Sequence, residues 1–187
     1  MNIPGEAAYK GQGISYCATC DAKYFQDKEV IIIGGGNSAI EETEFISKFA
    51  SKITIITHGD ALRANKDAQS NVSTNPKVTI LYNSEPKEFI KDSGRMSVVI
   101  EQTKTKQRET VSADGIFVFV GMQPNVSLFE NVFDVDQWGY FKVSDEMETS
   151  VAGVYSVGDI NSKKFRQITT AVADGTIAAI AISKKIQ

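Results

Sequence analysis

The chain has only two cysteines, and both lie in the short segment "CATCD", where an acid directly follows the second thiol. Two residues separate Cys17 from Cys20. This spacing lets a dithiol close into a small disulfide ring and keeps the resolving thiol beside the attacking one. A carboxylate at Asp21 would be placed to accept and donate the protons of such an exchange. These three residues form the candidate catalytic group.

Less reactive interpretations of this segment stay open. A Cys-x-x-Cys pair can be half of a zinc site, but zinc takes four ligands and the only histidine is His58. Such a site would have to be shared between two chains, so we predict no metal site. The cysteines could also be inert buried thiols, and Asp21 could be an ordinary exposed turn acid.

A glycine-rich turn follows within a βαβ pattern. Residues 28–60 contain a β-branched apolar run, the turn "GGGNSA", apolar residues at helical spacing and a second apolar run. Such a unit places two parallel strands side by side. The Gly-x-Gly-x-x-Ala pattern lets a pyrophosphate approach the backbone and the helix N-terminus, although a plain tight turn could show the same glycines. The candidate nucleotide-binding residues are Gly34, Gly36, Asn37, Ser38 and Ala39.

The residues after the second strand normally select the dinucleotide. An acid there holds the ribose 2′-OH of NAD, and an arginine holds the 2′-phosphate of NADP. Here the chain has Thr57, His58, Gly59 and Asp60, followed by Arg63. His58 and Arg63 are the candidates for this contact, and the pattern leaves the choice of nucleotide open.

The overall pattern predicts an α/β fold in two parts. Residues 1–112 should form a Rossmann-like nucleotide-binding domain with a β-hairpin or three-stranded β layer. Residues 113–187 should form a second segment with short strands and turns, and Gly121 and Pro124 mark a candidate domain boundary. The elements expected after the βαβ unit are a helix at 61–69, strands at 78–83, 97–102, 107–112 and 115–120, and a C-terminal helix at 167–184.

Composition narrows the classes of function. The 187 residues are 42% hydrophobic and 23% charged, and the net charge is −3 with both signs interspersed, which does not favour a nucleic-acid partner. No apolar run approaches the roughly 18 residues of a membrane span, so we expect no membrane contact. Neither a disulfide framework nor a signal-peptide core is present, and the cytoplasm is the expected compartment.

The ordered combination of motifs resembles the low-molecular-weight thioredoxin reductases. The segment "YKGQGISYCATCDAKYFQDKEVIIIGGGNSAIEE" is similar to the nicotinamide domain of that family, in which CATCD precedes a GGGxSA turn. The segments "GIFVFVGMQPN", "GYFKVSDEMETSVAGVYSVGDI" and "RQITTAVADGTIAAIAI" are similar to its C-terminal flavin-domain part. The resemblance implies a homodimeric flavoenzyme that passes electrons from NADPH or NADH through FAD and the dithiol to thioredoxin. It also implies that Cys20 faces the flavin, that Cys17 attacks thioredoxin and that Asp21 is their acid and base.

The same resemblance assigns two residue pairs to the flavin. Gly158 and Asp159 are similar to a Gly-Asp motif whose acid contacts the ribityl–pyrophosphate region of FAD. Arg166 and Gln167 are similar to an Arg-Gln pair that is also placed at the flavin. Taken alone, the first pair could be a simple turn, and the second could be the exposed first turn of the last helix.

The chain departs from the family pattern at the nucleotide clamp. The family usually has His-Arg-Arg-Asp with a further arginine three residues on, whereas this chain has only Arg63 of those arginines. His58 cannot replace a pair of permanently charged guanidinium groups. We expect NADH, weak discrimination between the nucleotides, or another donor such as a ferredoxin.

The chain also departs from the family in its flavin domain, whose first half has its own GxGxxG and precedes the nicotinamide domain. Only one such fingerprint is present here, so residues 113–187 would be the second half of that domain. The expected identity is a part of such an enzyme, either a truncated polypeptide or a split gene product that needs an N-terminal FAD-domain half. The alternative is a nucleotide-binding or redox module without independent turnover.

Overall fold

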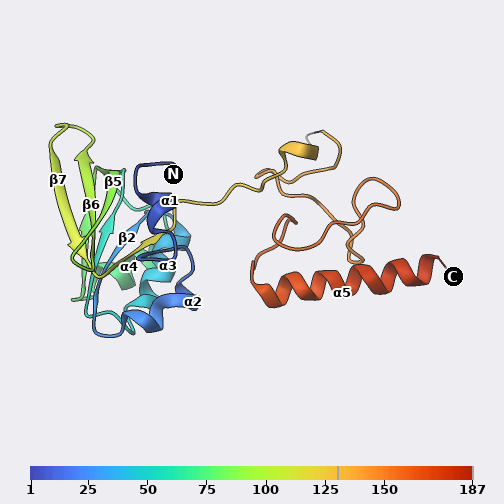
Figure 1. Ribbon diagram of the computed structural model, residues 1–187, viewed down its shortest axis with the longest axis horizontal. Helices are drawn as coiled ribbons and strands as arrows, with labels where there is room; N and C mark the ends of the chain where they lie inside the picture. Colours follow the sequence, from blue (N-terminus) through green and yellow to red (C-terminus); the bar gives the residue numbers. More distant parts are fainter. Residues whose placement is uncertain (130, 187) are drawn as a thin grey trace. The chain divides into compact units, whose positions relative to one another are not determined.

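The computed structural model describes residues 1–129 and 131–186. The chain forms two compact units, Met1–Gly121 and Met122–Gln187, which we call unit 1 and unit 2 (Figure 1). Within the described ranges, every helix is too short or too polar to span a bilayer.

A parallel sheet forms the centre of unit 1. Adjacent strands β2 and β3 pair in parallel, with Ile31 opposite Thr54, as the βαβ pattern predicts. The Rossmann-like α/β fold is therefore confirmed. The strands lie in the order β1 (Ile14–Ser15), β8 (Gly115–Val118), β2 (Glu29–Ile33), β3 (Lys52–Ile56) and β4 (Val78–Leu81).

Helices cover one face of this sheet. Val30 and Ile32 of β2 point into a core that they share with residues of these helices, because alternate residues of a strand face opposite sides. The helical segments are α1 (Glu6–Tyr9), α2 (Ala18–Asp21), the 3₁₀ helix η1 (Ala22–Phe25), α3 (Asn37–Ile46) and α4 (Lys66–Ser73). Of these, α2, η1, α3 and α4 contribute buried residues to this core.

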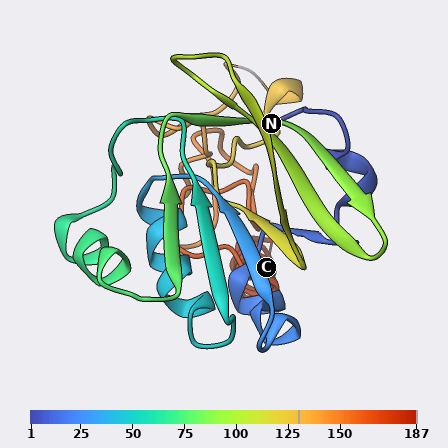
Figure 2. The ribbon, with the colours of Figure 1, turned by 90° about the vertical axis from the view of Figure 1, so that its left-hand side faces the viewer.

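An antiparallel sheet covers the other face (Figure 2). It consists of β5 (Ser84–Asp92), β6 (Arg95–Gln102) and β7 (Arg108–Ala113). Ile31 and Ile33 of β2 pack here against Phe89, Met96 and other buried residues. Unit 1 therefore has three layers, with the parallel sheet in the middle.

The predicted hairpin is formed by β6 and β7, and the predicted buried strand at 115–120 is β8, which pairs with β1 and β2 in the parallel sheet. The third strand of the antiparallel layer is β5, which we did not predict. Because β8 is hydrogen-bonded within the parallel sheet, unit 1 continues past residue 112, where we expected the boundary, to Gly121.

The helix expected at 61–69 begins later, at Lys66. The side chain of Asn65 caps it, since its Oδ1 accepts the backbone N–H of Ala68 at 2.8 Å. Residues 61–65 form a loop instead, and the backbone N–H of Arg63 donates to the carbonyl oxygen of Gly35 at 2.7 Å.

Unit 2 contains the 3₁₀ helix η2 (Ser127–Phe129) and α5 (Ile168–Lys185). Helix α5 begins and ends one residue later than predicted, and a capping box between Gln167 and Thr170 closes its N-terminus. The expected short strands do not form among residues 122–129 and 131–186. Isolated bridges occur instead, between Val135 and Phe141, Phe141 and Asn161, and Glu148 and Tyr155.

Candidate functional site

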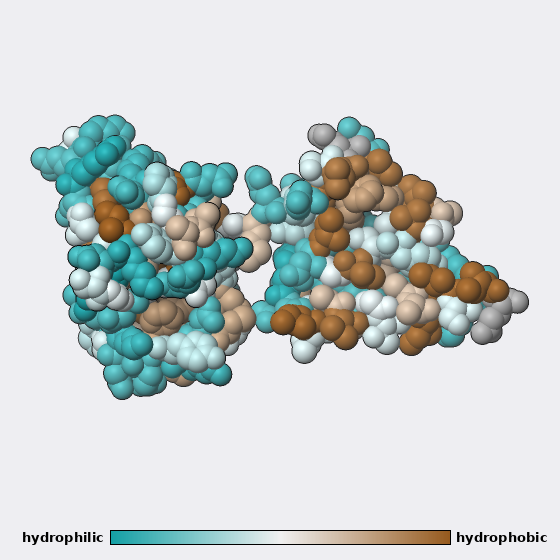
Figure 3. All heavy atoms as spheres, in the orientation of Figure 1, coloured by the Kyte–Doolittle hydropathy of each residue, from teal (hydrophilic) through white to brown (hydrophobic). Residues whose placement is uncertain are grey.

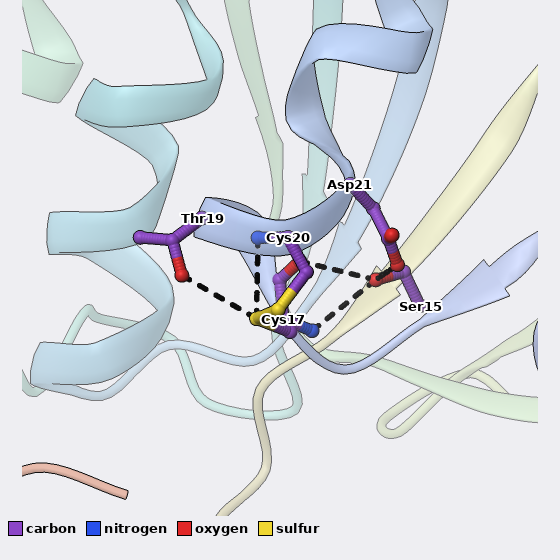
Figure 4. The surroundings of a disulfide bond; sticks show 5 residues. All are labelled: Ser15, Cys17, Thr19, Cys20 and Asp21. Atoms are coloured by element: carbon purple, nitrogen blue, oxygen red, sulfur yellow. Dashed lines mark hydrogen bonds between the residues drawn. A yellow bond between two sulfur atoms is a disulfide. The ribbon is translucent and has the colours of Figure 1, made fainter. Parts of the chain in front are cut away.

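The two cysteines form a disulfide, with their Cα atoms 5.3 Å apart. Cys17 caps the N-terminus of α2, and its Sγ accepts the backbone N–H of Cys20 at 3.2 Å (Figure 4). The hydroxyl of Thr19 lies 3.4 Å from the same sulfur. Cys17 is half-buried and Cys20 is exposed.

Asp21 is tied to this turn through both its backbone and its side chain. Its N–H donates to the carbonyl oxygen of Cys17 at 3.2 Å, and its Oδ2 accepts the hydroxyl of Ser15 at 2.6 Å. The Ser15 oxygen also accepts the N–H of Cys17 at 3.2 Å. We did not predict Ser15, because its contact to Asp21 depends on where β1 lies beside α2.

The residue before the first cysteine is also fixed. The hydroxyl of Tyr16 donates to Glu6 Oε1 at 2.8 Å. Burial, together with this hydrogen bond, raises the pKa of Tyr16 to about 12, so the phenol stays protonated at neutral pH. The chain therefore enters the dithiol turn along a path held by β1 and by α1.

The glycine-rich turn connects β2 to α3. Gly34 has a φ of +138°, and a Cβ there would overlap the carbonyl oxygen of Phe119 and lie 3.0 Å from the Cβ of Ala39. A Cβ on Gly36 would meet no atom within 4 Å. No side chain caps α3, so the first N–H groups of this helix can face an anion. This open and uncapped turn fits a pyrophosphate.

The other candidates of this turn have different roles. The Oδ1 of Asn37 accepts the backbone N–H of Asn65 at 2.8 Å and fixes the loop before α4. Ser38 is exposed, and Ala39 is completely buried where helix and strand meet.

The loop after β3 presents few charges to a nucleotide. A Cβ on Gly35 would overlap Thr57, which is buried against it. His58 and Arg63 are exposed. A hydrogen bond from Lys87 lowers the pKa of Glu85, and the charge of His58 acts in the same direction. His58 therefore lies near an acid.

Unit 1 builds the dithiol and the glycine-rich turn into one core. Ala18 lies between the cysteines, and Ala39 ends the glycine pattern. Both belong to the same buried cluster, together with Ala22 and Ile40. Small side chains at these positions let α2 and α3 approach each other closely.

The other four candidates lie in unit 2. Gly158 has a φ of +87°, and its N–H donates to Asp174 Oδ2 at 2.9 Å. Asp159 is exposed. The guanidinium of Arg166 lies 3.8 Å from the ring centroid of Tyr140 and donates to the carbonyl oxygen of Asp159 at 3.2 Å.

Asp174 of α5, which supports the turn at Gly158, was not identified from the sequence. It is 8% exposed, and besides Gly158 it binds Lys163 through a 2.6 Å ion pair. Its signal in the sequence is an acid inside an Ala/Ile-rich helix, which is costly to bury without partners. Gln167 is the N-cap of that helix.

Among the described residues, no three His, Cys, Asp or Glu side chains are grouped so that they could hold a metal ion.

The geometry of the turn predicts a structural role for Gly34 and a nucleotide-binding role for Gly36. Gly34→Ala should destabilise unit 1 by about 1–3 kcal/mol, because the new Cβ meets backbone at a positive φ. Gly36→Ala should leave the melting temperature unchanged and weaken nucleotide binding about tenfold, which is about 1.4 kcal/mol. Thermal unfolding and calorimetric titration with NADH and NADPH measure the two effects. Equal nucleotide binding by Gly36→Ala and the unmodified chain would contradict this use of the turn.

Comparison with known proteins gives a consistent match over the whole chain. Residues 1–175 match the family model of the pyridine nucleotide-disulphide oxidoreductases. The thioredoxin reductase of Bacillus subtilis (strain 168) is 39% identical over 188 residues and covers 100% of this chain. That of Peptoclostridium litorale is 42% identical over 195 residues and covers 98%. The chain spans 60% of the length of each relative.

Solved structures agree with these matches. Thioredoxin reductase from Streptococcus pyogenes MGAS5005 superposes with a TM-score of 0.90 at 37% identity, over 100% of this chain and 61% of that one. Thioredoxin reductase from Giardia duodenalis gives 0.84 at 30% identity, over 98% of this chain and 61% of that one. The chain belongs to the pyridine nucleotide-disulphide oxidoreductase family, and the predicted resemblance to the low-molecular-weight thioredoxin reductases is confirmed.

Proposed function

We propose that the chain carries the dithiol relay and the pyridine-nucleotide site of a thioredoxin-reductase-type flavoenzyme. The observation that carries the proposal is the common core of unit 1, in which α2 with its disulfide packs beside α3 with its open glycine-rich turn. A thiol pair built onto a nucleotide-binding domain suits electron transfer between a nucleotide and a disulfide substrate.

In this proposal the residues of unit 1 perform the thiol chemistry. Two electrons and two protons convert the Cys17–Cys20 disulfide to a dithiol. The Cys17 thiolate then attacks one sulfur of the disulfide of thioredoxin and forms a mixed disulfide. Cys20 attacks the sulfur of Cys17, releases thioredoxin as a dithiol and restores the original disulfide. The N–H of Cys20 at 3.2 Å from the Cys17 sulfur supports Cys17 as the attacking thiolate, because a donor favours the charged form.

FAD is the proposed second cofactor. When bound, it would transfer two electrons from a nicotinamide to the disulfide. The residues that would hold it are Gly158, Asp159, Arg166 and Gln167. Gly158 leaves its Cβ side open except for Ala171 at 3.9 Å, and Asp159 offers an exposed carboxylate to a ribityl hydroxyl. These features fit residues that would hold the ribityl–pyrophosphate region of FAD.

We further propose that flavin binding needs a segment outside this chain, the N-terminal half of the FAD domain. Within residues 122–129 and 131–186 there is no βαβ unit to hold the AMP end of FAD. Helix α5 leaves large apolar side chains uncovered, with exposed fractions of 84% for Ile168, 63% for Val172 and 53% for Ile180 (Figure 3). We propose that the further segment covers these side chains, since so many exposed large apolar residues on one helix favour a partner surface.

The loop after β3 bears on the choice of electron donor. The loop after β3 has an exposed imidazole at His58 and no arginine before Arg63, so we propose NADH or weak discrimination between the nucleotides. A ferredoxin-fed enzyme is the second candidate, favoured by the same missing arginines. A module that binds nucleotide without turnover of its own is the alternative description of the isolated chain. Homodimerisation and a cytoplasmic location stay predictions.

The assignment of the two thiols can be tested by trapping. Cys20→Ser, reduced and mixed with oxidised thioredoxin, should accumulate a mixed disulfide through Cys17, because the resolving thiol is absent. The matched variant Cys17→Ser should trap little. Non-reducing electrophoresis followed by peptide mass spectrometry measures both. Trapping by Cys17→Ser alone would reverse the roles, and trapping by neither variant would rule out thioredoxin as the substrate.

The proposed need for a further segment can be tested with the chain alone. After mixing with excess FAD and gel filtration, the chain should elute without flavin absorption, because unit 2 offers only part of a dinucleotide site. The complete Bacillus subtilis thioredoxin reductase, stripped of cofactor and treated in the same way, is the control that should take up FAD. One flavin retained per chain would show that these residues suffice.

A substitution at the exposed residue His58 should change the preference between NADPH and NADH. His58→Arg should tighten NADPH binding about tenfold by adding a guanidinium for the 2′-phosphate, while NADH binding stays the same. His58→Gln removes the imidazole without adding charge and is the matched control. Titration calorimetry with both nucleotides measures the change. If His58→Arg leaves the NADPH affinity unaltered, the end of β3 is not the contact for the ribose 2′ position.

A further inference from the structure

Ser15 connects the acid to the dithiol turn. Its side chain is buried, with 7% of the residue exposed, and its oxygen lies within hydrogen-bond distance of three groups. These are Asp21 Oδ2 at 2.6 Å, the N–H of Cys17 at 3.2 Å and the carbonyl oxygen of Cys17 at 3.3 Å (Figure 4).

The single hydroxyl proton of Ser15 has two possible acceptors. A carboxylate accepts a stronger hydrogen bond than a carbonyl oxygen does, and the distance to Asp21 is the shorter one. The proton therefore points to Asp21, and a lone pair of the same oxygen receives the N–H of Cys17. Within the described ranges, Asp21 Oδ1 has no hydrogen-bond partner, so the second carboxylate oxygen is available for proton exchange.

We propose that Ser15 is a positioning residue for thiol–disulfide exchange. It holds the Asp21 carboxylate in one orientation beside the dithiol turn, so that Oδ1 stays available to the thiols through solvent. The inference rests on the proposed dithiol relay, since it gives Asp21 the role of acid and base in that relay.

The hydrogen bonds define what the loss of this hydroxyl changes. In Ser15→Ala the carboxylate is free to rotate and the N–H of Cys17 loses its acceptor. The first change should slow proton transfer, and the second should weaken the turn. Only the first acts through Asp21, which allows the two effects to be separated.

The test uses the complete chain, first reduced with dithiothreitol and then freed of it by gel filtration, and an aromatic disulfide such as Ellman's reagent, without nucleotide, flavin or thioredoxin. The Cys17 thiolate displaces one aromatic thiolate, Cys20 closes the disulfide and displaces the second, and the two thiol protons pass to Asp21 and solvent. Ser15→Ala and Asp21→Asn should each slow the release of aromatic thiolate about tenfold at neutral pH. They should also shift the pH profile of the rate in the same direction.

The double variant decides whether Ser15 acts through Asp21. In the Asp21→Asn background, Ser15→Ala should change the rate by less than about twofold, because the group that it positions is gone. A full tenfold effect in that background, or an unshifted pH profile in Ser15→Ala, would reduce Ser15 to a structural residue. Ser84→Ala removes a fully buried hydroxyl that binds Tyr82 and Gln102, and its exchange rate should equal that of the unmodified chain.

A second pair of variants covers the case in which Ser15→Ala does not fold. Threonine and valine have nearly the same shape, so Ser15→Thr and Ser15→Val differ mainly in the hydroxyl. The threonine variant should exchange about tenfold faster than the valine variant, and equal rates would overturn the proposal. Because no thioredoxin is present, a failure of the trapping experiment leaves this result unaffected, and the two proposals can fail separately.

Discussion

The pairing of β1 with β8 is the constraint on which the dithiol depends. Strand β1 has only two residues, and it joins the sheet through Ile14 opposite Ile116 and Ser15 opposite Phe117. The N–H of Ile116 also donates to the carbonyl oxygen of Gly13 at 2.8 Å. A two-residue strand has no stability of its own, so its place in the parallel sheet depends on β8, which lies about a hundred residues further along the chain. The cost of closing that long loop rises only slowly with its length.

Strand β8 also holds the residues that follow Cys20. Phe117 is completely buried, and its ring meets that of Phe25 edge-on, with the centroids 5.2 Å apart. Gly115 makes room for this contact, since a Cβ there would overlap the Phe25 ring. The dithiol turn is therefore fixed before Cys17 by β1 and after Cys20 by η1, and both attachments lead to β8.

The parts of the fold that could be predicted are those whose signal is local. The βαβ unit and the glycine-rich turn follow from apolar spacing and glycine positions within one stretch. Strand β5 could not be predicted, because only Ser84 and Phe89 of it are buried and Pro86 with a bulge interrupts its pairing. Strand β8 was recognised as a strand, but its pairing with β1 and β2 could not be predicted, because these partners lie far away in the sequence.

The candidate site also has residues that could be predicted from local sequence and residues that could not. The cysteines and Asp21 lie within five residues of the sequence, so their spacing already indicates the chemistry. Ser15 has no signal in the sequence, and Asp174 shows only that an acid lies in an apolar helix, whereas the partners of both residues come from tertiary packing. Polar residues buried by packing carry a large cost if they lose their partners, which is why such residues repeatedly support a site without belonging to its motif.

Reduction of the disulfide removes a restraint from the short helix α2. A four-residue helix such as α2 is not stable in isolation, and in the oxidised chain the ring between Cys17 and Cys20 restricts its turn. After reduction that restriction is gone. Hydrogen bonds that do not depend on the S–S bond include the N–H of Cys20 to the Cys17 sulfur, the backbone bond from Asp21 to Cys17 and those of Ser15. The contacts of Ser15 that orient the acid are therefore among those that hold the turn in which the two thiols must meet to close the ring again.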